Sequence, residues 1–395
     1  PDGSVDPFRL CASNVFDAKI HGAKVLVYSE VIEFIKEQDT IKGVKVLDHH
    51  TGIVTDYHAP VTVNAGGIWG HHIAQMAGAN ISMFPAKGAL LIFAHRVNSV
   101  VINRCRKPAN ADILVPGDTV CVIGTTSTRV PYEECDHLKV TPDEVDLLLT
   151  EGAKLAPCLA ETRVLRAYAG VRPLVSADND PSGRNISRGI VCLDHESRDG
   201  IKGFISITGG KLMTYRLMGE MAADAVCKKL GRDAKCVTAD TPLPGSEPGG
   251  IEEISKKIWE VPTMVQKASV GRFGTQAAKL DFDGDVKGSL VCECEEVSVS
   301  EVDSAIENLE VNNLVDLRRR TRFGMGTCQG ELCACRAAGR LAKARKCTSK
   351  ARADLKDFMN ERWKGMYPVA WGETLRESAY TQWVYSEVMG LGEEI

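Results

Sequence analysis

The chain lacks any apolar run long enough to cross a membrane. The longest, near residues 89–94, falls far short of the roughly 20 residues that a spanning helix needs, and no signal-peptide pattern is present. The net charge of −4 and the short basic runs argue against nucleic acid as a partner. The 14 cysteines show no regular pairing, which is typical of a reducing compartment rather than of a disulfide scaffold. We therefore expect a cytoplasmic protein.

Five of the cysteines crowd into one short stretch. Cys292 and Cys294 form C-x-C, and after an intervening segment Cys328 and Cys333 form C-x4-C, with Cys335 just beyond. The intervening segment predicts a helix and a return of the chain, which would bring the two pairs together. Four thiolates gathered in this way can hold zinc or a [2Fe–2S] cluster.

Three interpretations of this stretch compete. Free cysteines are often simply buried, and zinc ribbons usually carry C-x2-C at both ends, whereas the spacings here are one and four. No histidine follows His195, so ligand type and spacing favour a [2Fe–2S] cluster. Glycines such as Gly324 and Gly326 would let backbone amides approach its sulfurs. Cys292, Cys294, Cys328 and Cys333 are the candidate ligands, with Cys335 as the alternative to Cys333.

Two strand–glycine–helix patterns occur earlier in the chain. Residues 60–69 form a β-branched strand that runs through Asn64, Ala65 and Gly66 into a helix. Residues 203–216 form a strand that ends in Gly209 and Gly210 and is followed by Lys211. Such turns place backbone amides and a helix N-terminus where a phosphate or a flavin can bind. Each pattern alone is a weak signal, because a tight turn with nothing bound has the same sequence.

Cationic and hydroxyl residues flank strands of the middle region. Arg172 lies beside glycine and proline in an apolar setting, where a guanidinium needs an anionic partner, either a ligand or a buried carboxylate. Thr125 and Thr126 follow a strand that ends at Gly124 and could bind a phosphate, or could form a simple turn.

Taken in order, these motifs resemble a known family. The chain resembles the FAD-dependent glycerol-3-phosphate dehydrogenases in the ordered series 63–69, 85–88, 124–126, 168–173 and 208–216. The cysteine stretch that follows narrows the resemblance to the large catalytic subunit of the anaerobic enzymes, which has a C-terminal BFD-like [2Fe–2S] domain. The resemblance covers essentially the whole chain.

The resemblance implies an activity and a set of partners. Such a subunit oxidises sn-glycerol 3-phosphate to dihydroxyacetone phosphate, with hydride transfer to N5 of FAD. The electrons leave through the [2Fe–2S] cluster and partner subunits to quinone in anaerobic respiration. The implied partners are a second flavoprotein-like subunit and an iron–sulfur subunit that anchors the complex at the inner face of the cell membrane.

The resemblance also implies roles for residues. Arg172 and Lys211 would be catalytic and would bind substrate together with Thr125 and Thr126. The flavin would be held by Asn64, Ala65, Gly66, Gly209, Gly210, Lys211, Leu212 and Met213. Related enzymes carry a histidine after a lysine–glycine–serine motif, whereas Ala89 and Leu90 follow Lys87–Gly88 in this sequence, so the catalytic base is not assigned.

The expected fold is an α/β (α+β) FAD-dependent oxidoreductase core with a mixed or antiparallel substrate-binding sheet, then a small helical [2Fe–2S] domain and a helical tail. Relatives begin with a strand–Gly-x-Gly-x-x-Gly–helix that this sequence does not show, so we expect the core to be incomplete at its N-terminus. The predicted domains are 1–237 (FAD and substrate), 238–286 (linker and helices), 287–346 ([2Fe–2S]) and 347–395 (tail).

Local patterns predict further features. Residues 24–29 are expected to form a strand and residues 43–57 a hairpin. The aromatic residues between 363 and 385 are interpreted as a local core in preference to a partner surface. Two other functions stay open on the residues alone: a non-catalytic iron–sulfur electron-transfer or redox-sensing protein, and a zinc-stapled interaction protein.

Overall fold

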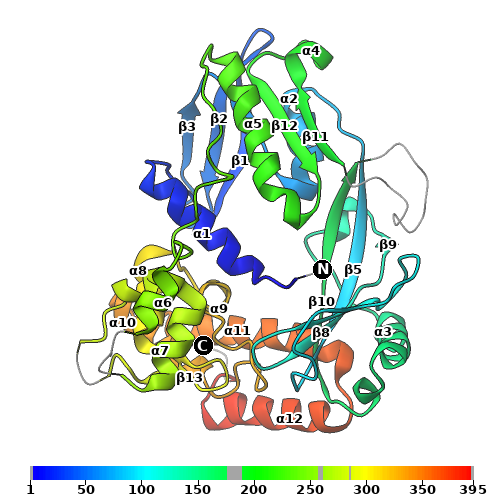
Figure 1. Cartoon of the computed structure of the whole chain (residues 1–395), viewed down its shortest axis with the longest axis vertical. Helices are drawn as coiled ribbons and strands as arrows, with labels where there is room; N and C mark the ends of the chain where they lie inside the picture. Colours follow the sequence, from blue (N-terminus) through cyan, green and yellow to red (C-terminus); the bar gives the residue numbers. More distant parts are fainter. Residues whose placement is uncertain (1–2, 176–188, 257–260, 284–285, 393–395) are drawn as a thin grey trace.

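The computed structural model describes residues 3–175, 189–256, 261–283 and 286–392. Figure 1 shows an upper part built from β1–β3, β11, β12, α2 and α5, and a lower part that contains the cysteine stretch. The long strands β5 (Met83–Phe93) and β10 (Val164–Val175) run between them. None of the helices in these described ranges is long and apolar enough to span a bilayer.

The upper part contains two small sheets. The first is an antiparallel meander of β1 (Ser29–Glu37), β2 (Thr40–Asp48) and β3 (Val54–His58), which confirms the predicted hairpin. The second has the order β11-β12-β4, from β11 (Ile190–Asp194), β12 (Phe204–Gly209) and β4 (Thr62–Asn64). Phe34 and Phe204 meet edge to face at 5.2 Å between ring centroids and pack the two sheets together. The strand predicted at 24–29 is wrong, because regular pairing begins only at Ser29.

Helices follow the strands of the second sheet. Strand β4 leads into η1 (Gly67–Trp69) and α2 (Gly70–Ala77), and β12 leads into η4 (Leu212–Thr214) and α5 (Tyr215–Lys229). The short helix α4 (His195–Asp199) connects β11 to β12. Both predicted strand–glycine–helix patterns are therefore present.

The middle sheet has the order β10-β5-β8-β7-β6, with β9 paired to β5. Its shorter strands are β6 (Ile102–Asn103), β7 (Ile113–Pro116), β8 (Cys121–Gly124) and β9 (Thr128–Arg129). Helix α3 (Pro142–Leu155) packs on this sheet and begins with a capping box between Thr141 and Glu144. The connections include η2 (Tyr132–Glu134) and η3 (Pro157–Ala160).

The lower part is mostly helical. Strands β13 (Leu290–Cys292) and β14 (Val297–Ser298) pair, and then come α8 (Val299–Asn308), α9 (Leu314–Thr321), α10 (Ala334–Arg345) and α11 (Ala351–Met366). Before them lie α6 (Gly250–Ser255), α7 (Thr263–Phe273) and η5 (Gly274–Lys279). Cys292 and Cys333 belong to the core of this part, and Ala12 of α1 (Pro7–Ile20) packs into the same core.

The tail comprises η6 (Tyr367–Val369), α12 (Gly372–Trp383) and η7 (Val384–Val388). Its aromatic residues do not form the expected local core. Only Tyr385 is buried, whereas Trp363, Tyr367, Trp371, Tyr380 and Trp383 are exposed. The interpretation as a core is therefore wrong. These residues lie on α11, on α12 and on the segment between the two helices, and they are 44–69% exposed.

Candidate functional site

The two glycine turns lie side by side. Strands β4 and β12 are parallel neighbours with Asn64 opposite Ser206, so their carboxyl ends meet at one edge of the sheet. The Asn64 amide Nδ2 donates to the Ser206 hydroxyl (3.2 Å) and to the Gly70 carbonyl (2.8 Å), and Oδ1 accepts from the Gly66 amide (3.1 Å). The buried Asn64 side chain thus shapes the first turn and ties it to the second strand.

The second turn requires glycine. Gly209 and Gly210 have φ values of +76° and +70°, a region that other residues rarely adopt. A Cβ on Gly209 would lie 2.4 Å from the Gly189 carbonyl oxygen, and one on Gly210 would lie 2.6 Å from the Met218 sulfur. The chain therefore turns tightly here and opens directly into η4 and α5.

The residues at this edge fit a flavin. The buried Thr208 hydroxyl at the end of β12 has no hydrogen-bond partner in the described part of the chain, and the turn beside it carries no side chains. Lys211, Leu212 and Met213 are exposed, Met213 by 80%. A planar ring system with a polar edge would fit this surface better than solvent does. It would supply a partner for the hydroxyl, fit against the glycine turn and cover the exposed apolar side chains.

A buried histidine, which the sequence analysis missed, supports these turns. His195 Nδ1 donates to Asp199 (2.6 Å), and Nε2 accepts from the Ser206 hydroxyl (2.8 Å), whose oxygen accepts from Asn64. The same three residue types form hydrolytic triads on other folds. Here His195 is 0% and Ser206 1% exposed, so no substrate reaches them and the network is structural. The sequence carries no signal for this network, because the alternation of Ile205, Ser206 and Ile207 predicts an exposed Ser206, whereas β12 is buried on both faces.

Arg172 and Thr125, both predicted to bind substrate, lie together. The Arg172 guanidinium on β10 donates to the Thr125 hydroxyl (2.5 Å) and approaches the Ala86 carbonyl (3.5 Å). A Cβ on Gly88 would lie 2.6 Å from Arg172 Nη2, so glycine makes room for the guanidinium on β5. The guanidinium is therefore held between the backbone of β5 and the turn that follows β8.

Thr126 has a different environment. Its buried hydroxyl accepts from the Ala89 amide (2.9 Å) and donates to Glu144 (3.1 Å), which also pairs with Lys87 (2.7 Å). These bonds anchor helix α3 to β5. The predicted substrate role of Thr126 stays a prediction, and the direct contact of this segment with Arg172 comes from Thr125.

The four predicted cysteine ligands converge. The sulfurs of Cys294 and Cys328 lie 3.6 Å apart, and the Cys333 thiol contacts both Cys292 and Cys328. Two thiolates bound to one tetrahedral metal ion at about 2.3 Å would lie about 3.8 Å apart, so the 3.6 Å pair matches two ligands of one ion. Among the described residues no group of three or more His, Cys, Asp or Glu side chains is arranged so that it could hold a metal ion. The ligand set therefore stays a prediction that the pairwise contacts between the sulfurs support.

Backbone amides surround these sulfurs. Contact with the Cys333 thiol lowers the pKa of Cys292, and the amides of Gly324 and Glu295 lower it further. The amides of Leu332 and Gly330 donate to Cys328, whose pKa is also lowered, chiefly by contact with Cys294, while the same thiol contacts raise the pKa of Cys294 and of Cys333. Amide donors stabilise thiolates, so the glycine-rich approach is arranged as expected for a metal–sulfur site.

Cys335 points away from this group. Its sulfur contacts the Tyr385 hydroxyl (3.7 Å) and the Met389 sulfur (3.6 Å), and burial raises the pKa of its thiol. Between the two alternatives, the geometry favours Cys333.

Buried ion pairs hold the C-x-C loop. Arg272 of α7 pairs with Glu301 (2.7 Å) and donates to the carbonyls of Glu295 and Glu296. Glu295, next to Cys294, accepts from Arg322 (2.8 Å), which also pairs with Asp6 (2.9 Å). Arg272 and Arg322 thus hold the loop through its backbone carbonyls and the Glu295 side chain.

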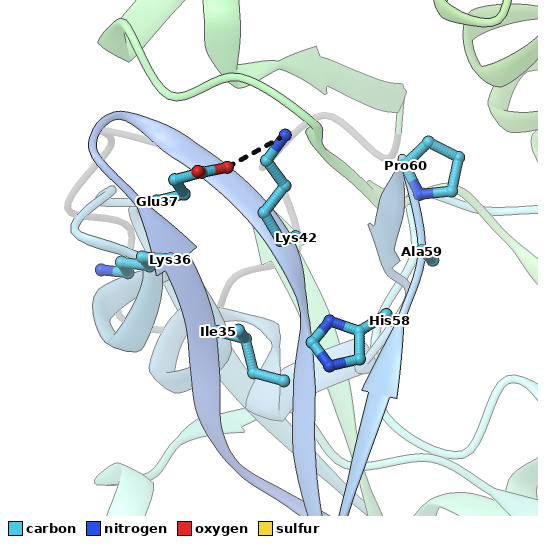
Figure 2. Close-up of a pocket in the computed structure, with 7 residues that line it drawn as sticks. All are labelled: Ile35, Lys36, Glu37, Lys42, His58, Ala59 and Pro60. Atoms are coloured by element: carbon cyan, nitrogen blue, oxygen red, sulfur yellow. Dashed lines mark ion pairs between the residues drawn. The ribbon is translucent and has the colours of Figure 1, made fainter.

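A shallow groove lies elsewhere, at the edge of the β1–β3 sheet. Figure 2 shows its lining by Ile35, Lys36, Glu37, Lys42, His58, Ala59 and Pro60, with Lys42 paired to Glu37 at 3.4 Å. None of the predicted site residues lines it, so we do not assign it to the site.

Comparisons with known proteins agree with this geometry. A family model described as FAD dependent oxidoreductase matches residues 1–216, and one described as BFD-like [2Fe-2S] binding domain matches residues 290–341. The A subunit of the anaerobic glycerol-3-phosphate dehydrogenase of Haemophilus influenzae is 57% identical over 394 residues, which cover 100% of this chain and 70% of that protein. Its counterpart in Escherichia coli K12 is 59% identical, with coverage of 100% and 73%.

This chain belongs to the family of anaerobic glycerol-3-phosphate dehydrogenase A subunits. A solved glycerol-3-phosphate dehydrogenase from Bacillus halodurans, complexed with FAD, has the same fold, with a TM-score of 0.69 at 21% identity over 93% of this chain and 74% of that one. The predicted family, fold class and pair of cofactors, FAD and [2Fe–2S], are confirmed. The domain boundaries and site residues stay predictions.

Proposed function

We propose that this chain is the catalytic subunit of a respiratory enzyme that oxidises sn-glycerol 3-phosphate to dihydroxyacetone phosphate. The observation that carries the proposal is the presence, in one chain of this family, of the paired glycine turns and the converged cysteines. When bound, FAD supplies a hydride acceptor and the [2Fe–2S] cluster supplies a one-electron carrier.

The flavin would be held at the carboxyl edge of β4 and β12. Backbone amides would contact the flavin at Ala65, Gly66, Gly209 and Gly210, where side chains are small or absent. The exposed turn that follows the second glycine pair carries Lys211, Leu212 and Met213. Asn64 would act through the turn that it shapes, since its side-chain bonds are all within the protein. The Thr208 hydroxyl, orphaned within the described residues, adds a further polar contact that sequence patterns did not indicate.

Arg172 would bind the substrate, because a planar guanidinium suits a phosphate oxyanion, and Thr125 orients it through their hydrogen bond. Lys211 would stabilise the negative charge that develops on the C2 oxygen or on the reduced flavin. The residue that removes the hydroxyl proton is not assigned.

Electrons would leave through the [2Fe–2S] cluster, which Cys292, Cys294, Cys328 and Cys333 would hold, and then through partner subunits to quinone. The relatives are named as subunits. We propose as partners a second flavoprotein-like subunit and an iron–sulfur subunit that holds this cytoplasmic chain at the inner face of the membrane. The exposed rings of α11 and α12 are the surface best suited to such a partner. We also propose the domain divisions 1–237, 238–286, 287–346 and 347–395.

The test is the visible spectrum of anaerobically purified protein, with iron, sulfide, zinc and flavin assayed on the same sample. We expect iron and sulfide near two per chain and flavin bands that bleach with sn-glycerol 3-phosphate but not with its mirror image, sn-glycerol 1-phosphate. Cluster bands that sn-glycerol 3-phosphate leaves unchanged, with flavin bound, would instead favour an electron-transfer or redox-sensing protein. A colourless protein with one zinc would overturn the proposal.

A further inference from the structure

Buried cations gather where the middle sheet meets the helical lower part. Arg166 lies on β10 and pairs with Glu361 of α11 at 3.5 Å. Arg362, also on α11, pairs with Glu377 at 3.3 Å. Guanidinium groups are costly to bury without a partner, and both of these arginines have a carboxylate.

Arg318 of α9 is different. Its guanidinium donates to the neutral Gln329 side chain (Nη2 to Oε1, 3.4 Å). Its Nε, like that of Arg362, is closed off from solvent and has no partner among the described residues, although the residue as a whole is only partly buried. Within the described ranges no Asp or Glu lies within 4 Å of it, in contrast to its neighbours Arg166 and Arg362.

The surroundings of Arg318 leave its charge uncompensated. Burial lowers the pKa of Arg318 well below its ordinary value, and the nearby Arg166 lowers it further. The opposing, favourable influences come from Glu361 and from the sulfur of Cys333. A site of this kind favours an additional negative charge nearby.

That negative charge would be at the cysteine site. Gln329, the partner of Arg318, directly follows Cys328, and its own amide holds the carbonyls of Met325 and Gly326 in the same loop (3.1 and 2.8 Å). Cys333 is the N-cap residue of α10, which packs against α9. Leu317, one residue before Arg318, shares a core with Cys292 and Cys333. Arg318 therefore lies near the sulfur of Cys333 and donates to the residue that follows Cys328.

We propose that Arg318 is a positioning residue that raises the reduction potential of the [2Fe–2S] site. This inference rests on the ligand set proposed above. Reduction adds one electron to a group held by four thiolates, and a fixed cation in a medium of low dielectric constant stabilises the reduced form more than the oxidised form. Arg319, the next residue, is exposed, so water and salt screen its charge.

The test is an EPR-monitored redox titration of the full chain with its cofactors, carried out on the wild type and on Arg318→Gln, Arg318→Lys and Arg319→Gln. Iron and sulfide are assayed on every sample. We expect Arg318→Gln to lower the ratio of reduced to oxidised cluster about tenfold at a fixed potential, which for a one-electron couple is a shift of about 59 mV downward. Arg318→Lys, which keeps the charge, and Arg319→Gln should stay close to the wild type.

An unchanged or raised potential in Arg318→Gln would overturn the proposal, as would an equal fall in Arg319→Gln, which would indicate a general effect of net charge. If Arg318→Gln retains no iron, the Arg318→Lys variant decides between charge and shape. A wild-type potential in Arg318→Lys supports the proposal, because that variant keeps the charge. Loss of iron from Arg318→Lys as well overturns it, because the shape of arginine and not its charge is then what the site needs. A wild type without iron and sulfide would instead refute the ligand set.

Discussion

The ion pair between Arg272 and Glu301 offers a quantitative test of how the cysteine loop is held. The two side chains are 8% and 0% exposed, and Arg272 also donates to the carbonyls of Glu295 and Glu296 beside Cys294. Arg272→Met keeps much of the volume and removes the charge. It leaves the Glu301 carboxylate buried, with only its capping-box bonds to Ser298.

Removing one partner of a buried pair costs about 3–5 kcal/mol, because the other charge stays desolvated without compensation. We therefore expect Arg272→Met to lower the free energy of unfolding of the lower part by that amount. Glu301→Gln keeps an acceptor for the capping box. The double variant removes both charges, so it should recover part of the stability that Arg272→Met alone loses.

The assay is urea unfolding under anaerobic conditions, followed by far-UV circular dichroism and by the visible absorption of the cluster. The matched control is Arg376→Met, since Arg376 and its partner Glu373 are 76% and 66% exposed and such surface pairs contribute about 0–1 kcal/mol. If Arg272→Met costs no more than Arg376→Met, or if the double variant is less stable than the Arg272→Met variant, the reasoning is refuted.

Three further predictions concern the site itself. Cys333→Ser should abolish iron binding while Cys335→Ser retains it, because Cys333, unlike Cys335, contacts other candidate ligand thiols. Iron per chain measures this, and the reverse result would exchange the two. Gly326→Ala should destabilise the loop by about 1–3 kcal/mol, since its Cβ would lie 2.5 Å from that of Cys294; an unchanged urea midpoint would contradict this. Arg172→Lys should lower kcat/KM for sn-glycerol 3-phosphate roughly 10- to 100-fold through the lost hydrogen bonds, and a steady-state rate equal to the wild type would remove Arg172 from the substrate site.

Local sequence patterns predicted many of the elements correctly. The capping box at Thr141 and the hairpin of β2 and β3 involve residues close in sequence, so their chemistry can be recognised in the sequence. The strand placed at 24–29 failed for the opposite reason. Its β-branched residues had no neighbouring strand to pair with, and pairing, not propensity, decides where a strand forms.

The aromatic tail shows a similar limit. Composition indicates that large rings are present, but not which face of a helix they occupy relative to the rest of the molecule. Trp363 and Trp383 turned out to be exposed and Tyr385 buried. No spacing rule distinguished them.

By itself the sequence determined the family of this protein and its two cofactors, and it predicted a ligand set from the C-x-C and C-x4-C pairs, because these depend on residue types at fixed local spacing. Tertiary structure decided which residues meet. It placed Thr125 rather than Thr126 against Arg172, turned Cys335 away from the other thiols, and joined Asp199, His195, Ser206 and Asn64 into one network. Such contacts join residues from separate elements, and they exist only once parallel pairing and helix packing have fixed where each side chain points.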